Sequence, residues 1–531
     1  MVASSHYQLL HAVHSLDDQD LQRELRKLND ADLLHVRGLA TDATYQFKHA
    51  LIRDAAYEAL LKRRRRELHG KIAEALANRF IDTAANQPEL VAHHYTAAGL
   101  GEQAVPYWQK AGEKAVDRSA YLEAISDVSK GLDLLKSLPE SSKHSFQELN
   151  LQTILGLAFM ATRSYAAAEV GTAYTRARTL CSQLGETRQL APVLYGLRIF
   201  HLVRVELPTA YEAAEQLLRL GQSTQDPSLL IEGHSGLGQI LYFMGEFTAA
   251  REHLEQVIAI YDSQKSPSCT IRPVQDPGVI CRGYAGLTLW HLGYPDQSLK
   301  RALEAFTLAD ELHHPFSLAF TRNLMWQLYQ LRKQEKLALE QATAMRTLSV
   351  EYGFPFLVAI GTFMQGAMLV TQGRIEGGLI QMRQGMDAYL SGGSELGRET
   401  FLSGLAAAYG VARRIDEGLA LVTEAIAFVN KTGQRRSEAR LYLCQGALLL
   451  TAGGREREAE ECFRHALNVA CRQQAKSLEL EAVLNLCKLW QQEGKKQEAR
   501  AMLAEIYNWF TEGFDTPDLK DAKALLEELA T

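Results

Sequence analysis

Apolar residues recur along most of this chain at spacings of three, four and seven positions, which places them on one face of a helix. Near the C-terminus, two such runs flank a turn at Gly494, and a small residue, Ala499, follows five positions later. The same frame returns about every 40 residues toward the N-terminus. Its anchor positions, most of them small, are Ala459, Gly418, Gly378, Ala338, Ser298, Ala250 and Ala210, and the frame continues to Val170 and Ala124. The pattern predicts a repeated helical hairpin.

The small anchors have a physical purpose, because two antiparallel helices cross closely only where side-chain bulk is missing. Apolar residues surround them, such as Leu237, Leu241, Leu254 and Val257 in one unit. A single hairpin cannot bury this face alone, so neighbouring hairpins stack and the core runs along the array. The fold class that follows is all-α, a right-handed solenoid of helical hairpins.

Several helix starts and one long connection also follow from the sequence. Asp226, Asp276 and Thr516 each precede a proline, which is the order of a capping side chain followed by Pro in the first turn. One interval between anchors is 48 residues long and contains a polar, Pro-rich stretch, Asp262–Gly278. We expect this stretch to be a surface loop between repeats.

The opening of the chain follows a different pattern. A helix is predicted over Asp20–Leu28, and two short runs, Leu34–Val36 and Tyr45–Phe47, form a hairpin around the turn from Gly38 to Thr44. A helix, a two-stranded wing and then another helix indicate the C-terminal half of a winged-helix domain.

The chain therefore divides into three regions, which are a partial winged-helix domain over 1–47, a helical junction with the first repeat helices over 48–118, and the repeat array over 119–531. Of the 531 residues, 47% are hydrophobic and 23% are charged, which is the globular range and excludes disorder as the main state. The formal charge of -6 argues against a protein that mainly coats nucleic acid.

The seven cysteines include no CxxC pair and are odd in number, so they favour neither a disulfide framework nor a zinc site. We expect buried, reduced thiols. No secretory signal opens the chain. The most apolar windows, Leu357–Val370 and Leu441–Leu450, are shorter than the ~20 residues that a bilayer requires and read as buried repeat helices. We therefore expect a cytoplasmic protein without membrane contact, metal or cofactor.

The glycine and small-residue spacing resembles the tetratricopeptide repeat, and Trp108, Ala111 and Gly112 reproduce its opening step most closely. The period of about 40 exceeds the usual 34, as in the longer repeats of sensor regions in signal-transduction ATPases. The segments 45–80 and 87–121 resemble the junction in a large bacterial family, in which a P-loop ATPase module, often preceded by a class III adenylate or guanylate cyclase domain, is followed by a winged helix and such repeats. The residues that carry this likeness best are Phe47, His49, Ala50, Leu51, Asp54, Ala55 and Tyr57.

The likeness covers nearly the whole chain, yet the catalytic parts of that family have no counterpart in it. A P-loop needs GxxxxGK[ST], because backbone amides must surround the phosphates while Lys and a hydroxyl reach phosphate and Mg²⁺. No such string occurs, and the residues before 20 leave no room for a nucleotide-binding sheet or a cyclase domain. We expect the C-terminal regulatory part of such a protein, either a fragment or a separately encoded remnant, and not an enzyme.

Two groups of residues suggest other chemistry. The basic run of Lys62, Arg63, Arg64, Arg65 and Arg66 beside a winged helix would suit DNA binding, although pairing with Glu58, Glu67 or an adjoining ATPase module is the interpretation we favour. The pairs His93-His94 and His313-His314 lie next to each other on helices, so their side chains diverge by roughly 100° and cannot chelate one ion together. We expect ordinary surface or core histidines.

The concave groove of the solenoid is the better candidate site. The first helix of each tetratricopeptide hairpin lines the inner surface, and aromatic and amide side chains there suit a peptide or a small ligand. Transferring that frame predicts a partner-binding set of Tyr195, Gln239, Tyr242, Trp290, Asn323, Gln327 and Gln330.

The leading hypothesis is a non-catalytic sensor and scaffold. Its groove would bind a protein or small effector, and the junction at 48–118 would transmit the state of the array to an ATPase or cyclase module in cis or trans. The alternative is a winged-helix transcription regulator that binds DNA through its first helices and Arg63–Arg66. A third interpretation is that the intact protein is an enzyme because of domains missing from this chain.

Overall fold

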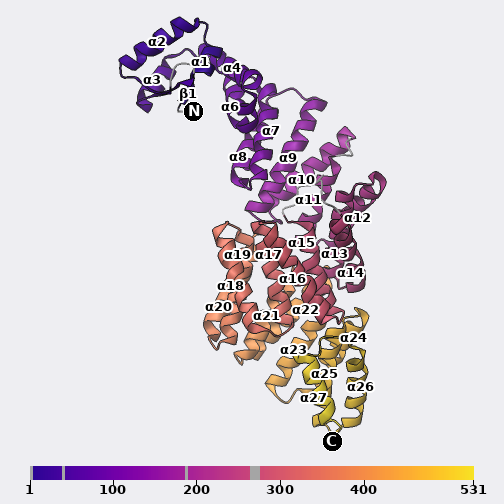
Figure 1. The fold of residues 1–531 in the computed structure, drawn as a ribbon. Helices are drawn as coiled ribbons and strands as arrows, with labels where there is room; N and C mark the ends of the chain where they lie inside the picture. Colours follow the sequence, from indigo (N-terminus) through magenta and orange to yellow (C-terminus); the bar gives the residue numbers. More distant parts are fainter. Residues whose placement is uncertain (1–3, 39–41, 186–188, 264–274, 531) are drawn as a thin grey trace. The chain divides into compact units, whose positions relative to one another are not determined.

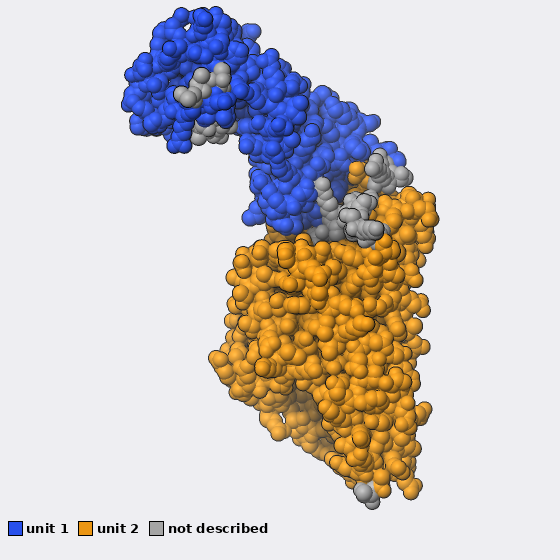
Figure 2. All heavy atoms as spheres, viewed as in Figure 1, with its two compact units in different colours: residues 1–158, 182–185 blue, residues 159–181, 186–531 orange. Residues whose placement is uncertain are grey.

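The computed structural model describes residues 4–38, 42–185, 189–263 and 275–530, and these form three strands and 27 helices. Contacts between Cα atoms divide the chain into two compact units. Unit 1 comprises residues 1–158 and 182–185, and unit 2 comprises 159–181 and 186–531 (Figure 1, Figure 2). The predicted all-α, tetratricopeptide-like solenoid is confirmed. The division at residues 47 and 118 stays a prediction.

Unit 1 opens with a small antiparallel sheet in the order β1-β3-β2. The predicted helix and both predicted strands are present, but β1 was missed because its three residues carry no alternation of hydrophobic and polar side chains. One strand, two helices and two further strands form this N-terminal part, whose core is Tyr7, Leu21, Leu25 and Leu34. Its assignment as a partial winged helix stays a prediction. The elements of this unit, in chain order, are β1 (Ser4–His6), α1 (Tyr7–Val13), α2 (Asp18–Asp30), β2 (Leu34–Arg37), β3 (Thr44–Phe47), α3 (Ala50–Ala59), α4 (Lys62–Arg79), α5 (Ile81–Asn86), α6 (Pro88–Ala98), α7 (Gly101–Asp117), α8 (Tyr121–Lys136) and α9 (Ser142–Thr162), the last of which continues into unit 2.

Unit 2 is built from successive hairpins in which an odd-numbered helix is followed by an even-numbered one (Figure 1). We call the odd-numbered helices inner and the even-numbered ones outer, because the odd-numbered helices supply most of the wall of the cavity described below. The inner helices are α11 (Leu190–Val203), α13 (Pro227–Met244), α15 (Pro277–His291), α17 (Pro315–Leu331), α19 (Pro355–Thr371), α21 (Arg398–Val411), α23 (Glu438–Ala452), α25 (Lys476–Gln492) and α27 (Pro517–Glu528). The outer helices are α10 (Ala168–Leu184), α12 (Leu207–Thr224), α14 (Phe247–Ser263), α16 (Pro295–Glu311), α18 (Glu335–Glu351), α20 (Ile375–Ser391), α22 (Ile415–Thr432), α24 (Glu456–Arg472) and α26 (Lys496–Trp509).

The predicted anchors are the points at which the two helices of a hairpin meet. Nine of the ten are the fourth residue of the second helix of their hairpin, Val170 is the third residue of α10, and all ten are buried. Gly378 shows why they must be small, since a Cβ there would lie 2.7 Å from the carbonyl oxygen of Gly366. At the neighbouring Gly377, a Cβ would meet nothing within 4 Å. The period of the sequence therefore reports helix crossings directly.

The predictions for helix starts have mixed outcomes. The Asp226 and Asp276 carboxylates accept hydrogen bonds from the backbone N–H of Ser228 and Val279, both at 2.9 Å, as expected of N-caps. At Thr516 the predicted helix start is confirmed, since α27 begins at Pro517, but the predicted side-chain cap is wrong, because the Thr516 hydroxyl donates to the carbonyl of Gly513 at 2.7 Å. Most of the predicted loop Asp262–Gly278 (264–274) and the tip of the hairpin turn (39–41) lie outside the described residues.

The hairpins of unit 2 wind into a superhelix whose successive turns touch. Hydrogen bonds join residues that are 185 to 230 positions apart, which corresponds to about five hairpins per turn. The backbone N–H groups of Glu395 and Leu396 both donate to the carbonyl of Val203, at 2.8 and 3.0 Å. The Ser477 hydroxyl donates to the carbonyl of Trp290 at 2.5 Å. The loops of one turn thus form a polar seam with the loops of another.

Candidate functional site

A cavity with two lobes lies along the axis of the unit 2 superhelix, partly open to solvent. The first lobe has a volume of about 130 Å³ and the second about 420 Å³. The two lobes are adjacent, because five residues border both, namely Trp326, Gln327, Phe363, Thr400 and Arg436. The inner helices α13, α15, α17, α19 and α21 supply most of the wall, because their inner faces converge on the axis.

The two lobes differ in their walls. Aromatic rings dominate the first lobe, and they are Tyr165, Phe243, Tyr284, Phe320, Phe356, Phe363, Tyr389 and Phe401. Aliphatic and methionine side chains dominate the second, including Leu331, Met368, Val370, Met382, Val411 and Leu443. Burial raises the pKa of Tyr284 and Tyr389 well above the ordinary value, so both phenols stay uncharged.

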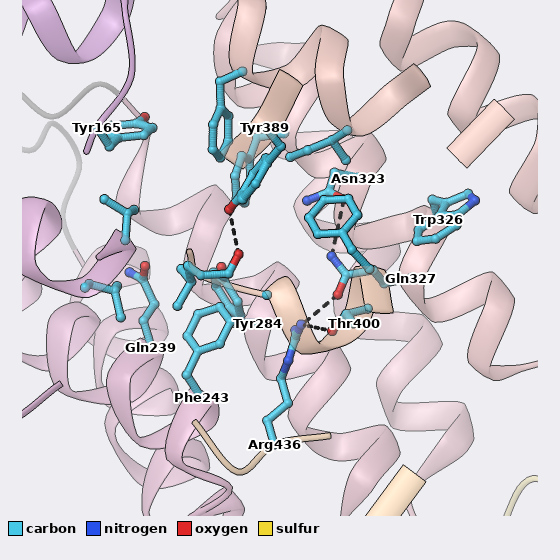
Figure 3. Close-up of a pocket in the computed structure, with 18 of the residues that line it drawn as sticks. Tyr165, Gln239, Phe243, Tyr284, Asn323, Trp326, Gln327, Tyr389, Thr400 and Arg436 are labelled. Carbon is cyan, nitrogen blue, oxygen red and sulfur yellow. Dashed lines mark hydrogen bonds between the residues drawn. The ribbon is translucent and has the colours of Figure 1, made fainter. Parts of the chain in front are cut away.

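Arg436 is the polar centre of the site and is only 7% exposed. It donates to the Thr400 hydroxyl at 2.8 Å and to the Gln327 side-chain oxygen at 3.3 Å, and both contacts can be followed in Figure 3. It also donates to the hydroxyl of Tyr242 at 3.3 Å. Burial acts to lower the pKa of Arg436, but the neighbouring Tyr242 and Glu399 outweigh it and raise the pKa above its usual value. The guanidinium is therefore charged.

Glu399 supplies the opposite charge behind the wall of the cavity. Its carboxylate lies 3.5 Å from Arg436 Nε and is fully buried. Thr400 and Ser437 donate hydroxyl hydrogen bonds to it at 3.1 and 3.2 Å, and the Gln434 amide donates a further one. Because Arg436 also donates its backbone N–H to the carbonyl of Phe243 at 3.1 Å, this network belongs to the seam between turns as well as to the cavity.

The second lobe contains one further pair of opposite charges. Arg440 Nη2 lies 3.3 Å from a carboxylate oxygen of Glu481, and both residues border the lobe. His291 also borders it, and burial lowers the pKa of His291 well below the ordinary value, so the imidazole is neutral. Each charge that we find in the wall is thus matched by an opposite charge among the described residues.

Five of the seven residues of the predicted partner-binding set come together here. Gln239 and Asn323 border the first lobe, Tyr242 and Gln330 the second, and Gln327 both. The Gln327 amide donates to Asn323 Oδ1 at 3.3 Å (Figure 3).

The remaining two residues of that set lie elsewhere in unit 2. Tyr195 is buried in a separate apolar cluster with Leu194 and Leu217. Trp290 packs in the core and borders another, much smaller cavity. As a partner-binding set, the seven residues stay a prediction.

Sequence reasoning missed the side of the cavity that comes from later repeats. Arg436, Thr400, Phe363 and Tyr389 lie up to about two hundred positions from Tyr242, and their approach depends on the pitch of the superhelix. One signal was available, namely the polar turn Gln434–Ser437. It carries two adjacent arginines directly before an apolar inner helix, and such a pair indicates a turn that contacts another part of the protein.

The predicted basic patch opens α4 in unit 1. Arg63 and Arg64 each lie 3.2 Å from Glu67, and Arg65 lies 3.1 Å from Glu58, the partners expected for a solvated helix face. Lys62 and Arg66 are exposed. The patch therefore offers less unmatched positive charge than its sequence implies.

The paired histidines make contacts of their own. His94 Nδ1 lies 2.8 Å from Nδ1 of His69, and burial lowers the pKa of His94 to about 3. His314 caps α17 by accepting from the N–H of Ser317 at 3.2 Å. Within the described ranges, no group of three or more His, Cys, Asp or Glu residues is placed to hold a metal ion.

The predictions for the cysteines and for the two most apolar windows can also be compared with the structure. Cys181, Cys281 and Cys487 are buried, but the expectation of buried thiols is wrong for Cys471, which is exposed, and Cys269 lies outside the described residues. The windows Leu357–Val370 and Leu441–Leu450 fall within the buried repeat helices α19 and α23. No helix in the described part of the chain has the length and apolarity needed to span a bilayer.

Comparison with known sequences finds one significant curated relative, and no family model matches the chain. The relative is a protein of Rhizobium meliloti (strain 1021) described as uncharacterized protein R02095, 25% identical over 467 residues. The match covers 85% of this chain and 44% of the relative, so the chain spans less than half of the relative's length.

Comparison with solved structures finds other helical repeat proteins. A Rap protein crystallised with competence and sporulation factor superimposes with a TM-score of 0.51 at 11% identity, covering 71% of this chain and 99% of that one. This likeness shows a shared tetratricopeptide-like fold and nothing further. A Rap conjugation gene regulator of plasmid pLS20 in complex with the Phr* peptide matches at 14% identity, covering 70% of this chain and 96% of that one, with a TM-score of 0.43 that is too low to support an inference.

Proposed function

We propose that this chain is a non-catalytic sensor and scaffold that binds an effector in the two-lobed cavity and transmits its occupancy to an ATPase or cyclase module, in cis or in trans. The observation that carries the proposal is the position of the Arg436 network, which borders both lobes and also joins two turns of the superhelix. A ligand that contacts this network changes the stability of the seam and hence the pitch of the array.

Three further observations support this proposal. The cavity combines apolar walls with a small number of placed polar groups, as ligand sites do. The match covers 44% of the curated relative, so the relative is roughly twice as long as this chain, which is compatible with additional modules. A Rap protein of similar fold was crystallised with competence and sporulation factor, so a solenoid of this kind is able to hold a ligand.

Ligand-induced stabilisation tests the binding step. A panel of peptides and small metabolites is added to residues 1–531, and a rise in the melting temperature identifies ligands. Val411 lies at the second lobe and is 58% exposed, so Val411→Trp fills the lobe without a clash in the core. Val350 on α18 is 57% exposed and borders neither lobe, which makes Val350→Trp the matched control. We expect Val411→Trp to abolish the shift and Val350→Trp to retain it, and equal shifts in both variants would place binding elsewhere.

The non-catalytic assignment has its own test. Purified residues 1–531 are assayed for ATP hydrolysis and for synthesis of cyclic AMP or cyclic GMP. The proposal expects no turnover above that of a heat-unfolded sample, and measurable activity that follows the folded protein would refute it.

DNA binding is the alternative, favoured by the partial winged helix of β1, α1, α2, β2 and β3. Helix α2, which would enter a groove of DNA in such a domain, carries four acidic and three basic residues. Its net negative charge is repelled by the phosphate backbone. The deciding measurement is binding to a labelled duplex across a salt series. Affinity that falls with salt and is lost in Arg63→Ala/Arg65→Ala would favour the alternative over the sensor.

A further inference from the structure

The chemistry of the two-lobed cavity restricts the effector more tightly than the fold does. The first restriction is size, because hydrogen bonds of the seam hold together the loops beside the groove. Ser164 and Ser394 are both buried at this seam and lie 3.0 Å apart between their hydroxyl oxygens. The occupant of the cavity must fit lobes of about 130 and 420 Å³, which are only partly open to solvent.

The second restriction is charge. Arg436 faces Glu399 and Arg440 faces Glu481, so the described wall offers no unmatched charge to a ligand. A charged ligand would lose its hydration on entry without gaining a counter-charge, which is unfavourable in a largely apolar site. An uncharged ligand does not lose hydration of this kind.

The third restriction is the placement of polar groups. Gln330 borders the second lobe among Leu331, Met368 and Val370, and the contact recorded for its side chain is a long one of 3.9 Å to the sulfur of Met368. A thioether is a weak acceptor, so the amide of Gln330 keeps most of its capacity to donate and accept hydrogen bonds. A primary or secondary amide on a ligand matches both capacities.

We propose that the occupant is an uncharged amphipathic small molecule, with an amide or similar head group at Gln330 and an apolar portion against the aliphatic and methionine wall of the second lobe. This proposal rests on the proposed function, since it assigns the ligand class of the same cavity.

Three probes with the same eight-carbon chain test the assignment, namely octanamide, octanoate and octylammonium. Each is titrated into residues 1–531 by calorimetry at neutral pH. We expect octanamide to bind at least about tenfold more tightly than either ion, because only the ions lose hydration without compensation. Val411→Trp should remove octanamide binding, and Val350→Trp should keep it.

A change of charge at Gln330 gives a second, independent readout. Gln330→Lys places an unmatched cation in the wall, so we expect octanoate to gain about tenfold and octanamide to weaken. Gln372→Lys, just beyond the end of α19 and outside the lining of either lobe, is the control and should leave both affinities unchanged. Circular dichroism establishes that each variant is folded.

The outcomes separate the ligand class from the proposed function. Preference of the unaltered protein for octanoate or octylammonium overturns the uncharged class, yet the cavity remains the site if Val411→Trp abolishes that binding. If none of the three probes binds while a capped six-residue peptide without charged side chains does, and Val411→Trp abolishes it, the small-molecule assignment is wrong and the proposed function stands. Binding that is indifferent to Val411→Trp contradicts both.

Discussion

Two arginines of unit 2 are buried beside a glutamate, and their surroundings differ sharply. Arg436 and Glu399 share a network in which Thr400, Ser437 and Gln434 also take part. Arg198 Nη2 lies 3.6 Å from Glu232, and Arg198 Nε and Nη1 have no hydrogen-bond partner among the described residues, whereas in Arg436 this is true of Nε alone. Both pairs are almost fully buried, so burial alone does not distinguish them.

The difference is the number of hydrogen bonds that replace lost hydration. A buried ion pair is tolerable only when further donors and acceptors satisfy its remaining atoms. Burial raises the pKa of Glu232 to about 7, and the nearby Arg198 only partly opposes that rise. The Arg436 guanidinium therefore stays charged where it joins two turns, whereas Glu232 beside Arg198 gains or loses a proton near neutral pH.

Removal of the arginine should separate the two pairs most clearly. Arg436→Met leaves the Glu399 carboxylate buried without its cation, and we expect a loss of about 3–5 kcal/mol in the free energy of unfolding. Arg198→Met should lose about 1 kcal/mol or less, because Glu232 becomes neutral by binding a proton. Urea denaturation at pH 6 measures both. Equal losses would mean that the hydrogen bonds around Glu399 do not distinguish the pairs.

The pH dependence of stability tests the Glu232 side of the comparison. The pKa is about 7 in the folded protein against a reference of 4.5, so the folded state binds the extra proton between these values. The free energy of unfolding should therefore decrease by about 2–3 kcal/mol as the pH rises from 4.5 to 7. Glu232→Gln should lack this decrease.

The pH dependence of stability has to be compared between two proteins, because other groups change the free energy of unfolding in the opposite direction as the pH rises. The lowered pKa of His94 makes the folded state more stable as the pH rises through the range from about 3 to its reference of 6.5. Subtracting the curve of Glu232→Gln from that of the unaltered protein removes this contribution. A difference that stays flat from pH 4.5 to 7 would contradict the assignment to Glu232.

The hydrogen bonds around Glu399 allow a finer test. Gln434→Leu removes the amide that donates to the buried carboxylate, and we expect a loss of about 1–2 kcal/mol. Gln473 is also buried at the seam, but its amide donates at 2.9 Å to the neutral carbonyl of Arg435. Gln473→Leu should therefore lose less, about 1 kcal/mol or below. Chemical denaturation of the two variants compares a charged with a neutral acceptor, and a larger loss for Gln473→Leu would count against the role of the network.

These pairs also show which parts of the molecule the sequence was able to predict. The anchors, such as Gly378 and Ala459, repeat because each hairpin crosses in the same way, so a regular spacing reveals them. Gln239, Asn323 and Gln327 followed from the same frame, since the frame determines which face of an inner helix points to the axis. A repeat period does not establish the sensor role, the ATPase or cyclase partner, or the domain boundaries.

Contacts between turns could not be predicted from the sequence, and the reason is physical. Small rotations at each hairpin add along the array, and the sum determines whether the Arg436 loop meets Phe243 or lies in solvent. No local pattern around Tyr242 encodes a partner 194 positions away. The buried charges of Glu399 and Glu232 were missed for the same reason, because an isolated glutamate in an amphipathic helix resembles a solvated one.

An exposed ion pair across the same seam should give the smallest effect and define the lower end of the comparison. Lys333 Nζ lies 2.5 Å from Asp518, and the Lys333 side chain is 50% exposed. Burial acts to lower the pKa of Lys333, but the hydrogen bond to Asp518 raises it overall. Because solvent screens the pair, Lys333→Met should lose only about 0.5 kcal/mol or less, and the loss should shrink further in high salt. Lys336→Met on the exposed face of α18 is the control and should lose nothing measurable. If Lys333→Met instead lost as much as Arg436→Met, the seam would depend on charge alone, and the hydrogen-bonded burial that distinguishes Arg436 would not explain its strength.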